Sequence, residues 1–196
     1  RNTARLQTKG LISSLTENFG PARLPLLVLD SPPRPGDFTA RHAAISGFST
    51  YSRGLKFALD NQETFLFNSV EEFEYEYSSQ PTLIFGFTFQ VWKVVSLIRS
   101  ASRSFSFDRA VLLHGGGWKK MENHKVSRDV FRDEVSRILG VRGVRDYYGM
   151  IEQTGTIYIE CSHGSLHAPP SGDFLIRDPI TLEVVPDGNQ GLIQVF

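Results

Sequence analysis

The chain has 196 residues, of which 40% are hydrophobic and 21% are charged, so it is long enough to bury a core without disulfide support. Lysine plus arginine and aspartate plus glutamate both total 21, and this balance excludes the basic surface typical of proteins that bind nucleic acid or anionic membranes. One cysteine rules out an internal disulfide, no stretch approaches the ~18 apolar residues of a membrane span, and no signal segment opens the sequence, so we expect a cytoplasmic protein.

The first half of the sequence alternates helical and extended patterns. Apolar residues at helical spacing predict a helix within residues 3–20, with Gly20 as its stop. The run LPLLVLD, residues 24–30, is almost continuously aliphatic, which predicts a strand buried on both faces. SPPRPGDFT must then be a loop, because its prolines and glycine cannot continue either element. A further helix is expected over residues 44–58.

The second half continues this alternation up to residue 161. The predicted elements are a buried strand TLIFGFT (82–88), a helix FQVWKVVSLIRSASRSF (89–105), a strand that runs into a glycine-rich loop DRAVLLHGGG (108–117), and a helix SRDVFRDEVSRILG (127–140). Ser127 is the expected N-cap of the last helix and Gly140 lies beyond its end.

The order of these elements predicts an α/β fold with a mostly parallel sheet flanked by helices. After residue 161 the pattern changes to strands without helices between them, and the sequence Pro186-Asp187-Gly188 predicts a turn between two of them. We therefore expect an α/β subdomain over residues 1–161, followed by an antiparallel β segment over residues 162–196.

Two loops follow neighbouring parallel strands. HGGGWKK occupies residues 114–120, and DYYGMIEQTGTIYIEC, residues 146–161, predicts a strand, an exposed polar turn and a second strand. Ligands of open α/β sheets bind at the carboxyl ends of the strands. Gly115, Gly116 and Gly117 would let the backbone approach a flat or anionic ligand, although a turn that needs positive φ explains the same residues.

HGGG also occurs in the oxyanion loops of lipases and esterases. That function requires a serine nucleophile in a G-x-S-x-G elbow after the glycines, and the sequence contains none. An α/β-hydrolase is therefore the less favoured alternative.

The glycine loop, the helix and strand after it, and YYGMIEQTGT together resemble the adenylate-forming ligases, specifically the LuxE-like acyl-protein synthetases and the phenylacetate-CoA ligases. The resemblance covers residues 80–196 with matching order and spacing. It implies ATP-dependent activation of a carboxylic acid to an acyl-adenylate, then acyl transfer to a thiol of a protein or of CoA. The substrate would be a fatty or aryl acid, and the cofactors ATP and Mg²⁺.

The resemblance also implies roles for single residues. Tyr148 would stack on adenine, Gly149 would let the backbone approach the nucleotide, and Glu152 would be the catalytic Mg²⁺ ligand, while Gly115, Gly116 and Gly117 would line the adenine side. The remaining nucleotide-binding residues are Tyr147, Met150 and Thr154. Thr154 or Thr156 would replace the threonine that the superfamily has where this chain has Ile151. Judged without the resemblance, both tyrosines fit strand-end packing and Glu152 fits a solvated turn.

Cys161 allows three interpretations. It is a buried small hydrophobe of the strand TIYIEC, an acyl-accepting nucleophile, or a zinc ligand together with His163 and His167. The first is favoured, because the run alternates as a strand and three ligands with no second cysteine make an incomplete structural zinc site.

Other residues are expected to have structural roles. Phe85, Phe87, Phe89 and Trp92 fit a core better than an acyl tunnel, and Lys119 and Lys120 are expected to be solvated. The phosphate loop, the ribose-binding aspartate and the lid lysine of the resembled ligases have no counterpart in the sequence, so we expect an internal fragment of a longer ligase. A non-catalytic nucleotide-binding or scaffold module is the alternative function.

Overall fold

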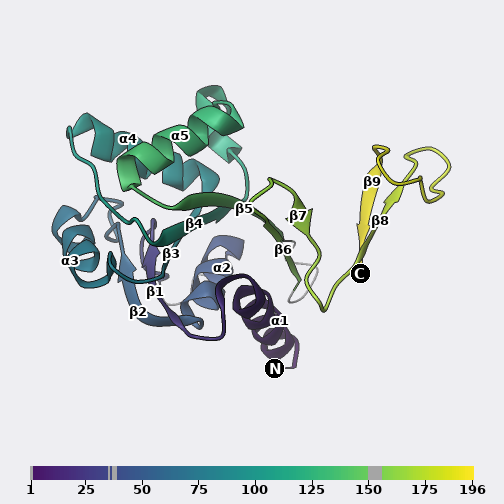
Figure 1. The fold of residues 1–196 in the computed structure, drawn as a ribbon, viewed down its shortest axis with the longest axis horizontal. Helices are drawn as coiled ribbons and strands as arrows, with labels where there is room; N and C mark the ends of the chain where they lie inside the picture. Colours follow the sequence, from purple (N-terminus) through teal and green to yellow (C-terminus); the bar gives the residue numbers. More distant parts are fainter. Residues whose placement is uncertain (1, 35, 37–38, 150–155) are drawn as a thin grey trace.

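The computed structural model describes residues 2–34, 36, 39–149 and 156–196. In this part of the chain a seven-stranded sheet has helices on both faces, and a two-stranded sheet follows it (Figure 1). The helices are α1 (Asn2–Phe19), α2 (Ala40–Ser49), α3 (Phe67–Tyr77), α4 (Thr88–Ser100), the 3₁₀ helix η1 (Lys119–His124) and α5 (Arg128–Leu139). The strands are β1 (Leu24–Val28), β2 (Ser52–Phe57), β3 (Thr82–Phe87), β4 (Ala110–Gly115), β5 (Gly143–Gly149), β6 (Ile157–Glu160), β7 (Leu166–His167), β8 (Phe174–Arg177) and β9 (Leu192–Val195).

The large sheet has the strand order β2-β1-β3-β4-β5-β6-β7. Strands β1 to β5 pair in parallel, and β6 and β7 add to the edge in antiparallel orientation. Every residue of β1 and β3 is buried, as their continuous aliphatic sequences predict for strands that are covered on both faces. The predicted α/β class with a mostly parallel sheet is confirmed.

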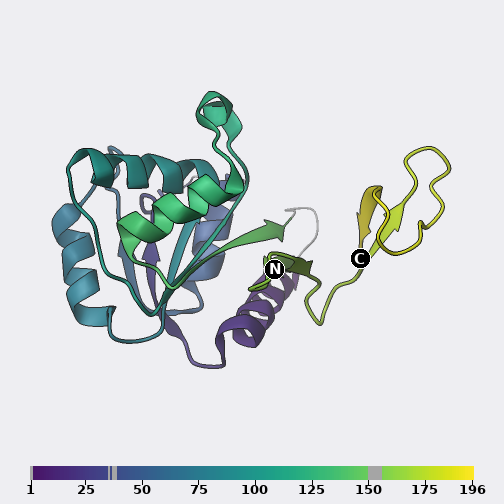
Figure 2. The same cartoon turned by 45° about the horizontal axis from the view of Figure 1, so that its top comes forward.

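Helices cover the two faces of the sheet separately (Figure 2). Helices α3, α4 and α5 pack on one face over a core that includes Phe73, Val95 and Val135. Helices α1 and α2 pack on the other face, where Leu15 and Phe48 are buried. The sheet is therefore the middle layer of three.

The predicted ends of helix α5 are confirmed. The Ser127 side chain accepts a hydrogen bond from the Val130 backbone N–H at 3.3 Å, and Gly140 adopts a left-handed φ of 61° directly after the last turn. The loop between α4 and β4 packs against this turn, since the Phe105 N–H donates to the Ile138 carbonyl.

The helix expected over residues 44–58 is partly wrong. Helix α2 ends at Ser49, and residues 52–57 form edge strand β2, which pairs in parallel with β1 through Leu26↔Leu55 and Val28↔Phe57. An edge strand with one polar face carries a weak local signal, and its pairing with a distant strand decides its conformation. Helix α3, which covers β2 and β1, was likewise not predicted from the sequence.

The antiparallel character after residue 161 is confirmed. Strand β7 pairs with β6 at the edge of the large sheet, and β8 and β9 form a hairpin that lies apart from the body in both views (Figures 1 and 2). The Tyr158 hydroxyl donates to the Asp173 carbonyl at 3.0 Å, which joins the base of the hairpin to β6. The Asn189 N–H donates to the Pro186 carbonyl, so the predicted turn is present. A domain boundary at residue 162 stays a prediction.

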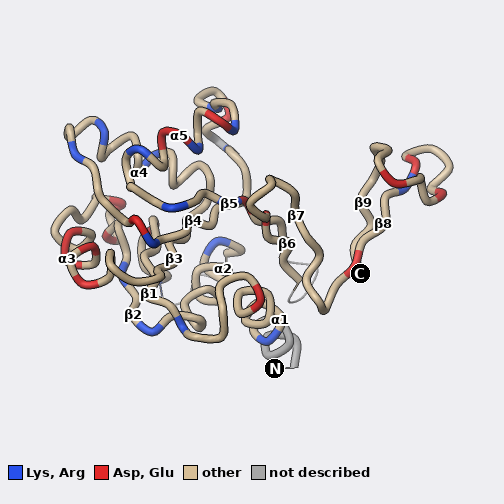
Figure 3. The backbone as a smooth tube through the Cα atoms, in the orientation of Figure 1, with Lys and Arg blue, Asp and Glu red and all other residues tan. Residues whose placement is uncertain are grey.

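Charged residues of both signs are interspersed along the described chain (Figure 3). Helix α3 carries the densest group of acidic residues, and basic residues are spread over several elements. Among the described residues no helix has the length and apolar character needed to cross a membrane.

Replacing Gly140 by alanine tests the end of α5. A Cβ there would lie 2.6 Å from the Phe105 carbonyl oxygen, in a left-handed conformation that by itself costs about 1–2 kcal/mol for a residue with a Cβ. We expect Gly140→Ala to lower the free energy of unfolding by more than Gly188→Ala, because Gly188 also has positive φ but has no atom within 4 Å of the added carbon. Denaturant titrations measure both losses, and equal losses would contradict the packing argument.

Candidate functional site

A cavity of about 990 Å³ opens at the carboxyl ends of the parallel strands. The pairs Phe87↔Gly115 and Gly115↔Tyr147 align the ends of β3, β4 and β5, so the glycine loop lies next to Tyr147 at the end of β5. This is the sheet edge at which the sequence predicted a ligand site, and the volume suits a small-molecule ligand.

The two sides of the cavity differ in chemistry. One wall, from α1, α2 and β6, is built largely of small apolar side chains, with hydroxyl groups at Thr8, Ser46 and Thr50. The opposite wall, from β4, β5, η1 and α5, carries the charged side chains. The apolar wall includes Leu11, Ala40, Ala43, Ala44, Gly47, Phe48 and Ile157, and the opposite wall includes His114, Gly116, Gly117, Lys119, Lys125, Arg128, Asp146 and Tyr148. Such a cavity can hold a ligand with one apolar and one polar or charged part.

The three glycines of the loop have different structural roles. Gly116 and Gly117 line the cavity with positive φ of 79° and 67°, and an added Cβ on Gly116 would lie 2.8 Å from the Phe87 ring. Gly115 is not among the described lining residues. A Cβ on Gly115 would lie 2.6 Å from the Tyr147 carbonyl oxygen, so this glycine permits the close approach of β4 and β5.

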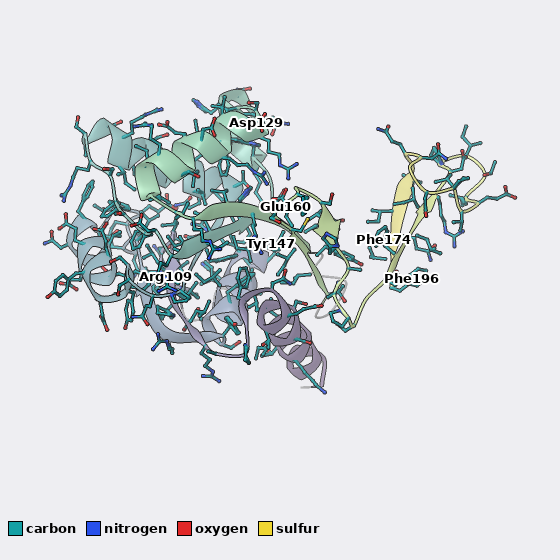
Figure 4. The ribbon with its side chains drawn as sticks, viewed as in Figure 1. Arg109, Asp129, Tyr147, Glu160, Phe174 and Phe196 are labelled. Atoms are coloured by element: carbon teal, nitrogen blue, oxygen red, sulfur yellow. The ribbon has the colours of Figure 1, made fainter. Side chains whose placement is uncertain are left out.

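The two tyrosines lie on opposite faces of β5. Tyr147 packs against Phe48 and Phe85, at ring-centroid distances of 5.5 and 6.0 Å, and Figure 4 places it within the body of the fold. Burial, reinforced by the Asp146 charge, raises the pKa of its phenol. Tyr148 is 38% exposed and lies 6.2 Å from the Tyr158 ring across the strand pair. Both tyrosines line the cavity, and Tyr148 presents the more accessible ring.

Part of the predicted site lies outside the described residues, namely Met150, Ile151, Glu152 and Thr154. Gly149 and Thr156, on either side of this segment, line the cavity. The roles predicted for this segment stay predictions.

His114 was quoted in the glycine motif but was not predicted as a site residue. The Thr88 hydroxyl lies 3.1 Å from the Gly115 carbonyl oxygen, to which it can donate, and 3.0 Å from His114 Nδ1. His114 Nδ1 also lies 4.0 Å from the Asp146 carboxylate. Burial, followed by the charges of Arg132 and Arg128, lowers the pKa of His114 to about 3, so the ring is neutral.

Asp146 was likewise not predicted. It lines the cavity from β5 with a half-exposed carboxylate, and burial raises the pKa of this group. Its position two residues before Tyr148 was visible in the sequence. The direction of its side chain was not, because that depends on the residues that α5 and β6 pack behind it.

A buried ion cluster supports this wall. Glu160 on β6 is 1% exposed and forms ion pairs with Arg128 and Arg132 of α5 (Figure 4 labels Glu160). One of its oxygens accepts hydrogen bonds from Arg132 and, at 2.8 Å, from the backbone N–H of Asp146. Arg128 also donates to the Gly164 carbonyl at 3.1 Å. The cluster fixes α5, β5 and β6 relative to one another.

The interpretation of Cys161 as a buried core residue is wrong. Cys161 is partly exposed in the tight connection between β6 and β7, where the His163 N–H donates to its sulfur at 3.4 Å. Hydrogen bonds from the backbone at Ser165 and His163, and then from the His167 side chain, lower the pKa of the thiol to about 6. Cys161 is not among the described residues that line the cavity.

The zinc hypothesis is not supported either. Among the described residues, no group of three histidine, cysteine, aspartate or glutamate side chains could hold a metal ion, and this includes Cys161, His163 and His167. The core assignment of the aromatic segment is confirmed for Phe85, which is fully buried, and for Trp92, which packs on the core beside Trp118. Phe87 is buried and also lines the cavity.

The neutral state of His114 predicts a pH dependence of stability. Its folded-state pKa of about 3 is below the ordinary 6.5, so its contribution is complete above pH 6.5 and is lost as the pH falls from 6.5 towards 3. We expect His114→Gln to flatten the dependence of unfolding free energy on pH in this window by up to about 1.4 kcal/mol per pH unit. Urea titrations between pH 4 and 7 measure the slope. The same change at exposed His124 is the control, and equal slopes for the His114 variant and wild type would contradict the burial argument.

The thiol of Cys161 should be reactive near neutral pH. We expect the rate of alkylation by iodoacetamide to rise with a midpoint near pH 6 in the folded chain and near the ordinary value of about 8.5 in denaturant. His167→Ala should move the folded-state midpoint upwards, because it removes one hydrogen bond to the thiolate. Since the sequence has one cysteine, mass spectrometry follows this site alone, and a common midpoint for folded and unfolded chain would refute the expectation.

Comparison with known proteins gives a family match over the whole sequence. The model of the family described as "Acyl-protein synthetase, LuxE" matches residues 1–196. The long-chain-fatty-acid–luciferin-component ligase of Aliivibrio fischeri is 26% identical over 143 residues, which are 70% of this chain and 38% of that protein. The corresponding ligase of Vibrio harveyi is 25% identical over 120 residues, covering 59% and 32%. The chain thus spans about a third of the length of these curated relatives.

Solved structures share the fold at low sequence identity. ATP-bound MatB from Rhodopseudomonas palustris superposes with a TM-score of 0.64 at 17% identity, over 98% of this chain and 35% of that one. A 2-hydroxyisobutyryl-CoA ligase in complex with an acyl-adenylate and CoA gives 0.66 at 13% identity, over 100% and 44%. The resemblance noted in the sequence is confirmed, and the chain belongs to the LuxE acyl-protein synthetase family, with the fold of the adenylate-forming ligases.

Proposed function

We propose that this chain forms part of the site at which an ATP-dependent ligase activates a carboxylic acid as its acyl-adenylate. The observation that carries the proposal is the single cavity in which a glycine loop, an accessible tyrosine ring and a carboxylate face an apolar wall. Formation of an acyl-adenylate needs a site for the nucleotide and a site for the acid side by side. An oxygen of the carboxylate must attack the α-phosphorus of ATP while pyrophosphate leaves.

The nucleotide would occupy the polar side of the cavity. Gly116 and Gly117 let the backbone approach the flat base, and the Tyr148 ring offers a stacking surface. The Asp146 carboxylate can accept a hydrogen bond from the amino group of the base. His114 beside it is neutral, so it leaves the negative charge of Asp146 available to this donor. These features support an adenine site built from the ends of β4 and β5.

The acyl group would occupy the apolar side, along α1 and α2. Small side chains at Ala43, Ala44 and Gly47 leave room for an alkyl or aryl group between these helices and the strand ends. The names of the curated relatives refer to long-chain fatty acids, and this favours a fatty acid over an aryl acid. The family description favours a protein thiol over CoA as the acyl acceptor.

Magnesium would be held by Glu152 together with phosphate oxygens, as the sequence predicted, and when bound it would neutralise phosphate charge. Glu152 lies outside the described residues, and Asp146 is the one carboxylate among the described residues that line the cavity. One or two carboxylates beside a polyphosphate suit a magnesium ion, so the donor set fits this cofactor.

The function is tested by carboxylate-dependent exchange of pyrophosphate into ATP, measured on the full-length protein with a panel of fatty and aryl acids. The proposal expects exchange that needs both magnesium and a carboxylic acid. ATP binding without exchange by any acid would instead support a non-catalytic nucleotide-binding or scaffold module.

Replacing Tyr148 by alanine tests the adenine platform. Loss of base stacking should weaken ATP binding by about 1–3 kcal/mol, measured by calorimetry on the full-length protein. Tyr75→Ala is the matched control, because Tyr75 is 95% exposed on α3 and does not line the cavity. An ATP affinity equal to wild type in a folded Tyr148→Ala protein would remove Tyr148 from the site.

A further inference from the structure

Lys119 is held over two aromatic rings at the cavity. Its Nζ lies 5.1 Å from the centroid of Phe87 and 5.6 Å from that of Phe89, and the residue lines the cavity where η1 begins. A cation at this distance from ring faces is attracted to them, so the ammonium has a defined position although the side chain is exposed. The sequence led us to expect only a solvated lysine.

The other cations of the cavity are already paired. Lys125 lies 2.8 Å from Glu122, and Arg128 pairs with the buried Glu160. In the part of the chain that the structure describes, Lys119 forms no ion pair, and its ammonium lies over the faces of Phe87 and Phe89. A ring face is a weaker partner for an ammonium than an anion, so Lys119 can accept an anionic ligand without breaking an existing ion pair.

The backbone at Lys119 is unusual as well. Its φ is 48°, a left-handed conformation that disfavours residues with a Cβ, and it follows the positive φ values of Gly116 and Gly117. Glycine would adopt this conformation more easily than lysine does. A residue kept in a disfavoured conformation at a cavity is a reason to look for a functional role of its side chain.

The two rings locate the ammonium relative to the cavity walls. Phe87 contacts the glycine loop, since a Cβ on Gly116 would lie 2.8 Å from its ring. Phe89 lies under the guanidinium of Arg41, which belongs to α2 on the apolar side, at 5.8 Å. Lys119 therefore lies at the boundary between the glycine loop and the wall formed by α2.

We propose that Lys119 binds the carboxylate of the acyl substrate at this boundary. The inference rests on the proposed function, because an acyl chain along α2 would place its carboxylate next to a nucleotide that lies over the glycine loop. There the ammonium forms a charge-assisted hydrogen bond with one carboxylate oxygen. It reduces the repulsion between this anion and the phosphates and leaves the other oxygen directed at the α-phosphorus.

The first test measures kinetics of the full-length protein. We expect Lys119→Met to raise the KM for the carboxylic acid on the order of 10- to 100-fold in pyrophosphate exchange, as the loss of a charged hydrogen bond implies, with the Kd for ATP within about twofold of wild type. Lys119→Arg keeps the charge and should restore most of the affinity. Lys56→Met, at a lysine of β2 that is likewise paired with a glutamate, Glu72, but does not line the cavity, is the matched control and should leave both constants unchanged.

The second test does not depend on activity. Displacement of a fluorescent fatty-acid probe from the full-length protein compares decanoate with decanol, which share the alkyl chain but differ in charge. The wild-type protein should prefer decanoate by about tenfold or more, and Lys119→Met should lose this preference while decanol binding stays the same.

The outcomes separate this inference from the proposed function. An unchanged KM together with an unchanged preference for decanoate in Lys119→Met would overturn the role of Lys119 while leaving the ligase function intact. A fall in ATP affinity with no change for the carboxylate would also overturn it, since the ammonium would then serve a phosphate. If the wild-type protein shows no exchange with any acid, the proposed function fails, and the decanoate preference still decides whether Lys119 binds a carboxylate.

Discussion

The close pairing of β4 with β5 fixes the distance between the glycine loop and the two tyrosines at the end of β5, Tyr147 and Tyr148. Gly115 lies opposite Tyr147 in this pair, and any side chain on Gly115 would collide with the Tyr147 carbonyl. The pairing of Phe87 with Gly115 adds the end of β3 to the same edge. The cavity, its polar wall and the position of Tyr148 all follow from this alignment. A parallel sheet provides it because all its strands end on one side.

Buried charge gives the polar wall its rigidity. Glu160 alone would be costly to bury, and it is tolerated because Arg128 and Arg132 pair with its charge and the Asp146 N–H donates to one of its oxygens. Burial lowers the pKa of His114, the same arginines lower it further, and the histidine at the cavity is uncharged. The cluster thus orients the strand that carries Asp146 and adds to the effect of burial on its neighbour. Removing one partner would leave an uncompensated ion and disturb both.

The cavity joins two surfaces that come from different layers of the fold. Helices α1 and α2 supply an apolar wall, and the strand ends with α5 supply a polar one. Lys119 stands between them on the rings of Phe87 and Phe89. This division suits the proposed function, in which an apolar acid is joined to a charged nucleotide. The β8–β9 hairpin contacts this body through Tyr158 and lies outside the cavity.

The sequence by itself determined the α/β class, the buried strands β1 and β3 and the ends of α5, because continuous aliphatic runs, caps and glycines are local signals. The tertiary structure alone decided that Ser52–Phe57 is a strand, since its partner β1 lies more than twenty residues away. It also decided that Cys161 is partly exposed, that His114 is neutral and that Lys119 lies over aromatic rings. Exposure, protonation and side-chain contacts depend on which distant residues surround a group, and no local pattern encodes those neighbours.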